Sequence, residues 1–150
     1  MRRAILIALF SLASCVANAD SEIYNQMESF FTDFNDGVPA DAMIERYFAN
    51  EVFVVSLSGT DFYSTKTETE NWFGSVLQSI RRAGWIRSVQ KDRSLCMIGE
   101  TTALYGIRYD RIFPNESKVP GSSIYTLEKR DDWRVVAVTV TSNDLKLECD

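Results

Sequence analysis

The sequence predicts a single α+β domain in which helices precede an antiparallel sheet. In the first half of the chain, apolar residues recur at helical spacing. After Gly84 the pattern changes to period two, in segments rich in β-branched and aromatic residues. The 150 residues are 45% hydrophobic and 25% charged, which is typical of one globular domain. With 3 Pro and 7 Gly, the chain has no room for a low-complexity linker.

Residues 1–19 have the layout of an export signal. Arg2 and Arg3 precede an apolar run, residues 4–13, that is too short to span a bilayer and ends in small residues. Such a segment is removed from the mature protein. We therefore expect a signal peptide over residues 1–19 and a folded domain over residues 20–150.

The end of this signal has two interpretations. The sequence Ala17-Asn18-Ala19 is an A-x-A site that favours cleavage after Ala19. The segment ending at Cys15 instead resembles a bacterial lipobox, whose cysteine becomes lipid-modified. The first predicts a periplasmic or secreted protein, and the second a membrane-anchored lipoprotein.

Three helices are predicted. The first covers residues 20–36 and ends at Gly37, the second begins at Pro39 and ends near Asn50, and the third covers residues 65–84. Two capping-box pairs compete at the start of the third helix, either Thr65 with Glu68 or Thr67 with Glu70. The helix aromatics are predicted to be core residues, because helical spacing accounts for them: Phe30, Phe31, Phe34, Trp72 and Phe73, with Trp85 just beyond the third helix.

Six strands are predicted. A small hairpin pairs residues 52–57 with 61–64, between the second and third helices. Four longer strands then form an antiparallel meander: residues 85–98, 101–113, 122–128 and 133–141. Residues 114–121 form its one long loop.

Charge and composition exclude several functions. The formal net charge is −5, with 16 Lys and Arg against 21 Asp and Glu, so no basic stripe for nucleic acid exists. Membrane association is expected only if Cys15 is lipidated. The chain has no His, which removes the commonest proton shuttle and metal ligand. We expect no metal site and no cofactor.

Cys96 and Cys149 remain after removal of the signal. In an oxidising compartment, an even pair indicates a disulfide that would hold the C-terminal tail. The alternative is a buried thiol at Cys96 and a loose thiol at Cys149.

The order of elements resembles the nuclear transport factor 2-like superfamily, which includes SnoaL-like polyketide cyclases and ketosteroid isomerase. The segment Phe34-Asn35-Asp36-Gly37, leading through Met43-Ile44 to residues 47–51, is similar to the family's helix, turn, helix and strand entry. Residues 133–136 resemble its final strand. The resemblance implies a cone, with three N-terminal helices packed in a strongly curved, mostly antiparallel sheet. It also implies an apolar pocket at the open end and a homodimer through the outer sheet face.

The resemblance does not supply the groups that enzymes of this fold use. Alignment with an isomerase places Ser56 at the catalytic base, Phe30 at the oxyanion-hole tyrosine and Tyr125 at the second acid. A dehydratase using pocket histidines is excluded because the chain has none.

The segment Arg108-Tyr109-Asp110-Arg111 is compatible with an enzymatic function. An Asp flanked by Arg resembles the residues that position water in the epoxide-hydrolase members of the superfamily. Alternation places Arg108 and Asp110 on one face, and Tyr109 and Arg111 on the other. If the Asp110 face lines the pocket, Asp110 is a candidate base supported by Arg108. If the other face does, Tyr105, Tyr109 and Arg111 offer aromatic walls and an anion hook. A solvated charge pair on the outer face is the third interpretation.

We therefore expect an exported domain that binds a small, partly apolar ligand or a protein partner in its pocket, without catalysis. The expected ligand-binding residues are Tyr63, Tyr105, Tyr109, Arg111 and Tyr125. One alternative is a SnoaL-like lyase, isomerase or hydrolase using Asp110 and pocket tyrosines. Another is an envelope interaction domain that uses its outer sheet face.

Overall fold

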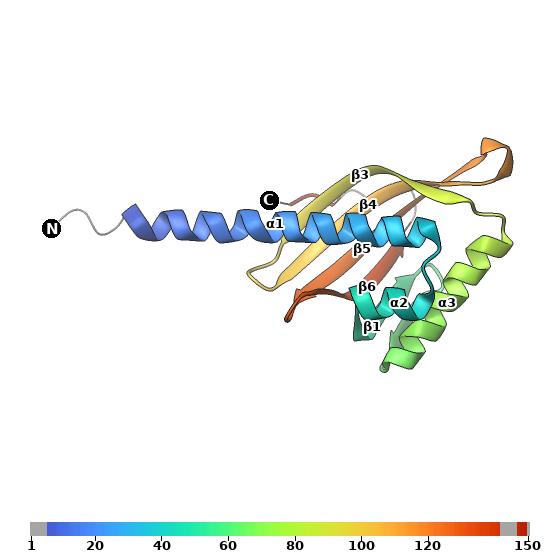
Figure 1. Cartoon of the computed structure of the whole chain (residues 1–150), viewed down its shortest axis with the longest axis horizontal. Coiled ribbons are helices and arrows are strands. Elements are labelled where there is room, and N and C mark those ends of the chain that lie inside the picture. The colour runs from blue at the N-terminus through green and yellow to red at the C-terminus, as the bar shows by residue number, and fades with distance from the viewer. Residues whose placement is uncertain (1–5, 142–146, 150) are drawn as a thin grey trace.

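The computed structural model describes residues 6–141 and 147–149 (Figure 1). The helices are α1 (Leu6–Asp36), α2 (Ala40–Tyr47) and α3 (Lys66–Arg82). The strands are β1 (Phe48–Ser56), β2 (Gly59–Tyr63), β3 (Arg87–Met97), β4 (Thr102–Ile112), β5 (Lys118–Lys129) and β6 (Trp133–Thr141). A 3-10 turn, Pro114–Glu116, lies between β4 and β5.

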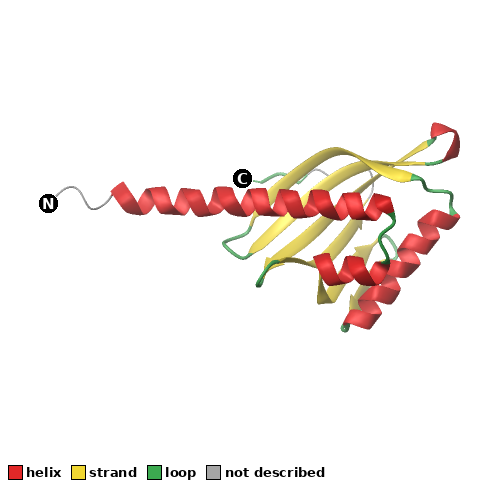
Figure 2. Ribbon diagram, viewed as in Figure 1, coloured by secondary structure: helices red, strands yellow, loops and turns green. Residues whose placement is uncertain are grey.

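One curved sheet carries the fold, with the strand order β2-β1-β6-β5-β4-β3. All neighbouring strands are antiparallel except β1 and β6, which are parallel. Figure 2 shows α1 lying along the sheet, with α2 and α3 beside each other at one end of the molecule. This arrangement confirms the predicted α+β class and the mostly antiparallel sheet.

The start of α3 settles which capping box forms. The Thr65 hydroxyl accepts a hydrogen bond from the Glu68 amide at 3.3 Å. The Glu68 carboxylate in turn accepts from the Ser64 amide at 2.8 Å, which holds the incoming chain. The structure therefore uses Thr65 and Glu68, and not Thr67 and Glu70.

Several element boundaries differ from the sequence prediction. Helix α2 ends at Tyr47 and not near Asn50, because strand β1 begins at Phe48 and not at residue 52. Helix α1 begins at Leu6 and not at residue 20, so it continues without a break through the end of the predicted signal segment. Strand β5 begins at Lys118 and not at Ser122, which shortens the predicted loop over residues 114–121. Among the described residues, Pro120 pairs with β4 alone, opposite Asp110, which suits a residue that has no backbone N–H to donate.

The core lies between α1 and the inner face of the sheet. Phe30 is at its centre, and its ring contacts those of Phe31, Tyr47 and Tyr125 edge to face at 5.1 to 5.5 Å. Every buried hydrophobic residue described on α1 lies at or after Ile23. Within the described residues, no helix combines the length and apolarity that a membrane crossing requires.

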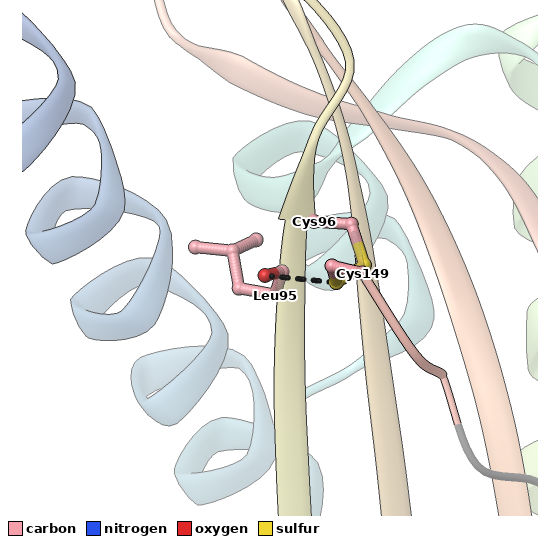
Figure 3. Close-up of a disulfide and its surroundings, with 3 residues drawn as sticks. All are labelled: Leu95, Cys96 and Cys149. Carbon is pink, nitrogen blue, oxygen red and sulfur yellow. Dashed lines mark hydrogen bonds between the residues drawn. A yellow bond between two sulfur atoms is a disulfide. The ribbon is translucent and has the colours of Figure 1, made fainter.

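A disulfide joins the C-terminal tail to the sheet (Figure 3). Cys96 on β3 is bonded to Cys149, with their Cα atoms 5.5 Å apart, and the Cys149 sulfur lies 3.4 Å from the Leu95 carbonyl oxygen. The tail also covers Gly106 of β4, where an added Cβ would stand 3.1 Å from the Leu147 Cβ. Of the two sequence alternatives for these cysteines, the structure contains the disulfide.

Candidate functional site

A cavity of about 320 Å³ lies between the helices and the inner face of the sheet. This volume is at the small end of the range for ligand pockets. Aromatic side chains are the largest group in its wall: Phe30, Phe31, Phe34, Phe48, Trp72, Phe73, Tyr63, Tyr109 and Tyr125. A few polar groups interrupt this wall: Ser56, Ser58, Asp61, Ser88, Arg111 and Ser123. The aromatic residues predicted as core therefore pack the core and also border the cavity. Trp85 is the exception, because it does not line the cavity.

Arg111 and Tyr109 form the polar group on β4. Both face the cavity, and the Arg111 Nη2 donates to the Tyr109 hydroxyl at 3.3 Å. The guanidinium also lies over the Tyr109 ring, 5.5 Å from its centroid. Its Nε–H is buried without a hydrogen-bond acceptor. No carboxylate of the described residues lies within ion-pair distance of Arg111.

Two further tyrosines present phenols at the cavity. The Tyr125 ring packs against Phe30 and Phe31, at 5.5 and 6.0 Å between centroids. The Tyr63 ring stacks on Trp72 at 5.6 Å. Burial raises the pKa of both phenols, and the charge of Asp61 raises the pKa of Tyr63 further. Both side chains therefore stay protonated at neutral pH and can donate to a ligand.

Tyr105, which the sequence analysis grouped with the ligand-binding residues, does not line this cavity. It shares the inner face of β4 with Tyr109, but it is fully buried and does not line the cavity. Its ring packs edge to face against Tyr24 of α1, 5.9 Å between centroids. Alternation identified its face correctly, but the helix covers the strand at that position.

Asp110 and Arg108 also lie outside the cavity. The Asp110 carboxylate pairs with the Lys91 ammonium at 3.0 Å, across the outer side of β3 and β4. Arg108 is exposed on the same outer side. The structure thus agrees with the solvated charge pair, and the enzymatic alternative loses the base that it placed among the pocket tyrosines.

The three positions aligned with isomerase groups all reach the cavity. Phe30, Ser56 and Tyr125 all line it. None of the three carries a carboxylate. Asp61 is the single carboxylate in the described lining, and it lies on the exposed hairpin strand β2.

Sequence reasoning missed several polar lining residues, namely Asp61, Ser88 and Ser123. Period two on β2 places Asp61 on the same face as Tyr63, so that signal was available. Ser88 lies opposite Arg111 across the β3–β4 ladder, a register that needs the structure. Within the described ranges, no group of three or more Cys, Asp or Glu side chains could hold a metal ion.

The curved sheet, the long helix against it and the cavity between them define the class of cone-shaped α+β domains. A family model described as NTF2-like protein (DUF6841) matches residues 21–143, and the chain belongs to this family. The resemblance to the nuclear transport factor 2-like superfamily is thereby confirmed. Among curated proteins, none matches the chain.

Solved structures of similar fold come from several bacteria. An NTF2-like protein of unknown function from Shewanella oneidensis is 17% identical, with 83% of this chain and 99% of that chain covered and a TM-score of 0.65. An NTF2-like protein with a cystatin-like fold from Novosphingobium aromaticivorans is 11% identical, with 95% and 93% covered and a TM-score of 0.71. At these identities the similarity shows the fold alone.

Proposed function

We propose that this chain is an exported binding domain that holds a small, partly apolar molecule in its cone cavity without catalysing a reaction. The observation that carries this proposal is the composition of the cavity wall. Aromatic rings are the largest group in it, with valines beside them, and a small number of polar groups interrupt this apolar lining, as in ligand pockets generally. The phenols of Tyr63, Tyr109 and Tyr125 with Arg111 are the groups that would orient the molecule.

The chemistry of the lining favours binding over turnover. General acid–base catalysis needs a titratable group within hydrogen-bond reach of the substrate, and the commonest such group, His, is missing from the chain. Burial raises the pKa of Tyr125, which makes its phenol a poor base at neutral pH. The remaining polar groups suit orientation of a bound molecule.

Export is the second part of the proposal. The signal-like residues 1–19 and the disulfide between Cys96 and Cys149 both support an oxidising compartment, periplasmic or extracellular. A chain that begins at Asp20 keeps every buried hydrophobic residue described on α1. Lipid modification at Cys15 would instead hold the same domain at a membrane.

Native mass spectrometry of the mature protein, recovered gently from its own cell envelope, tests the proposal. We expect one small molecule per chain and a polypeptide mass that begins at Asp20. A mass that fits a polypeptide beginning at a lipid-modified Cys15 would support lipidation and contradict cleavage after Ala19. An empty protein that also binds no small apolar probe would contradict the binding function.

A matched pair of variants tests whether the molecule occupies the cavity. Val140 and Val89 are valines on strands, 38% and 37% exposed, but only Val140 lines the cavity. Val140→Trp should fill the cavity mouth and abolish retention of the molecule. Val89→Trp should leave retention unchanged. Equal retention by both variants would place the molecule elsewhere.

We also propose that two copies associate through the outer sheet face. Phe53 on β1 and Phe62 on β2 are cross-strand neighbours there, each 50% exposed, and their rings stack at 4.4 Å. Val55 extends this apolar surface. Light scattering should give a dimer for the wild type and a monomer for Phe62→Asp. A monomeric wild type at micromolar concentration would contradict this, and capture of a different envelope protein would favour the interaction role.

A further inference from the structure

We propose that the cavity selects a carboxylate, bound by Arg111, on an otherwise apolar ligand. This inference rests on the proposed binding function and specifies the chemical class of its ligand. Arg111 is a cation on a mostly apolar wall, and no described carboxylate forms an ion pair with it. Arg111 is half-buried, and a cation partly removed from water is costly unless it is paired, so an anion brought by the ligand would relieve that cost.

The hydrogen bonds of Arg111 point to a planar anion. Nη2 donates to the Tyr109 hydroxyl, while the Nε–H is buried with no acceptor. The guanidinium presents its N–H groups as a flat fork, which matches the two oxygens of a carboxylate. The Tyr109 hydroxyl fixes one arm of the fork, and no other described residue accepts a hydrogen bond from the guanidinium, so its remaining Nη N–H groups are left for the ligand.

Charge within the cavity favours a monoanion over a phosphate dianion. The described lining holds one cation, Arg111, and one acid, Asp61, and it contains no Lys. A dianion would lack a second cation. Protonated phenols at Tyr63 and Tyr125 add neutral donors, which suit a singly charged or polar head group.

Gly121 is the positioning residue of this arrangement. It lies opposite Tyr109 in the β4–β5 ladder, and an added Cβ would stand 2.7 Å from the Tyr109 Cε2 and 3.0 Å from its hydroxyl. The absent side chain lets the Tyr109 ring lie against β5 and reach the Arg111 Nη2. Tyr109 and Gly121 therefore act through Arg111.

Two probes of the same shape test the charge preference. Calorimetric titration at pH 7 compares 2-naphthoate, which is anionic, with 2-naphthamide, which is neutral. We expect the wild type to bind naphthoate about ten-fold more tightly, a difference of about 1.4 kcal/mol. Arg111→Gln should bring the ratio of the two affinities close to one, while its affinity for naphthamide stays within about three-fold of the wild-type value. Gly121→Ala should lower the ratio by displacing Tyr109.

Arg108→Gln is the matched control, because it removes the same charge from the same strand on the outer side. It should keep the naphthoate preference. Equal loss of preference in Arg108→Gln and Arg111→Gln would assign the effect to overall charge and overturn the contact with Arg111. Equal affinity of the wild type for both probes would overturn the carboxylate class and leave ligand binding intact. Binding of neither probe would overturn both proposals.

Discussion

At the scale of single residues, Gly121 has a measurable effect on stability as well as on the cavity. Gly121→Ala places a methyl group against the Tyr109 ring, since the nearest ring atom lies 2.7 Å away. Because that ring borders the cavity and can move into it, we expect the free energy of unfolding to fall by only about 1 kcal/mol. Urea unfolding measures this.

Gly74→Ala is the control for that substitution. Gly74 lies within α3, and an added Cβ there meets only the Ala40 Cβ, at an ordinary 3.6 Å. Alanine favours a helix over glycine by about 0.5–1 kcal/mol, so this variant should be more stable than the wild type. If both variants were equally destabilised, the contact with Tyr109 would not be the cause.

Tyr47 carries a prediction about alkaline pH. Its hydroxyl donates to the Asp33 carboxylate at 2.8 Å, and Arg46 donates to the same oxygen at 2.7 Å. Burial and this hydrogen bond raise the pKa of Tyr47 to about 12. In the unfolded chain the tyrosine pKa is about 10. Stability from this group is therefore complete below pH 10 and is lost as the pH rises toward 12.

The measurement compares the free energy of unfolding at pH 9 and pH 11 in the wild type and in Tyr47→Phe. The wild type should lose more stability over this interval, because only its folded state keeps the Tyr47 proton. Equal losses in the two proteins would show that Tyr47 titrates normally.

At the scale of elements, the N-terminus of α3 depends on one capping residue. Thr65→Ala removes the acceptor of the Glu68 amide and should lower the free energy of unfolding by about 0.5–2 kcal/mol. Thr67→Ala, at an exposed position inside the same first turn, should change it by less than about 0.5 kcal/mol. A larger cost for Thr67→Ala than for Thr65→Ala would contradict this cap.

Local patterns in the sequence predicted the elements well, because helices and strands of different period leave different apolar spacings. The boundary of β5 was missed for a physical reason. A proline normally ends a strand, and the sequence does not show that the residues around Pro120 continue the ladder with β4 down to Lys118. The parallel pairing of β1 with β6 likewise joins segments that no local pattern connects.

The cavity was predicted less completely than the elements. Alternation separated Tyr109 and Arg111 from Arg108 and Asp110, but it could not show which face turns inward. The fold decides this, since α1 covers the Tyr109 face and Lys91 meets Asp110 on the other side. The sequence also does not show which positions along β4 lie under α1 and which face the cavity. Tyr105 was therefore grouped with the ligand-binding residues, although it is fully buried under the helix.

At the scale of the whole molecule, the disulfide between Cys96 and Cys149 links residues 53 positions apart. Cys149→Ser should lower the free energy of unfolding of the mature protein by about 2–4 kcal/mol, because the unfolded chain gains freedom. A reducing agent should lower the free energy of unfolding of the wild type by the same amount and leave that of Cys149→Ser unchanged. Two reactive thiols in denatured, unreduced wild type would contradict the bond.

Strand β6 lies between β1 and β5, although it is the last strand to be synthesised. Until residues 133–141 leave the ribosome, the β1–β2 hairpin has no neighbour in the sheet, and one edge of β5 stays open. A newly made chain therefore cannot join the β1–β2 hairpin to the rest of the sheet before β6 is made, whatever the stability of its first helices. Under the proposed export, a sheet that closes only after its last strand is made would leave the chain unfolded for longer, which is the state that a translocation channel for unfolded chains accepts.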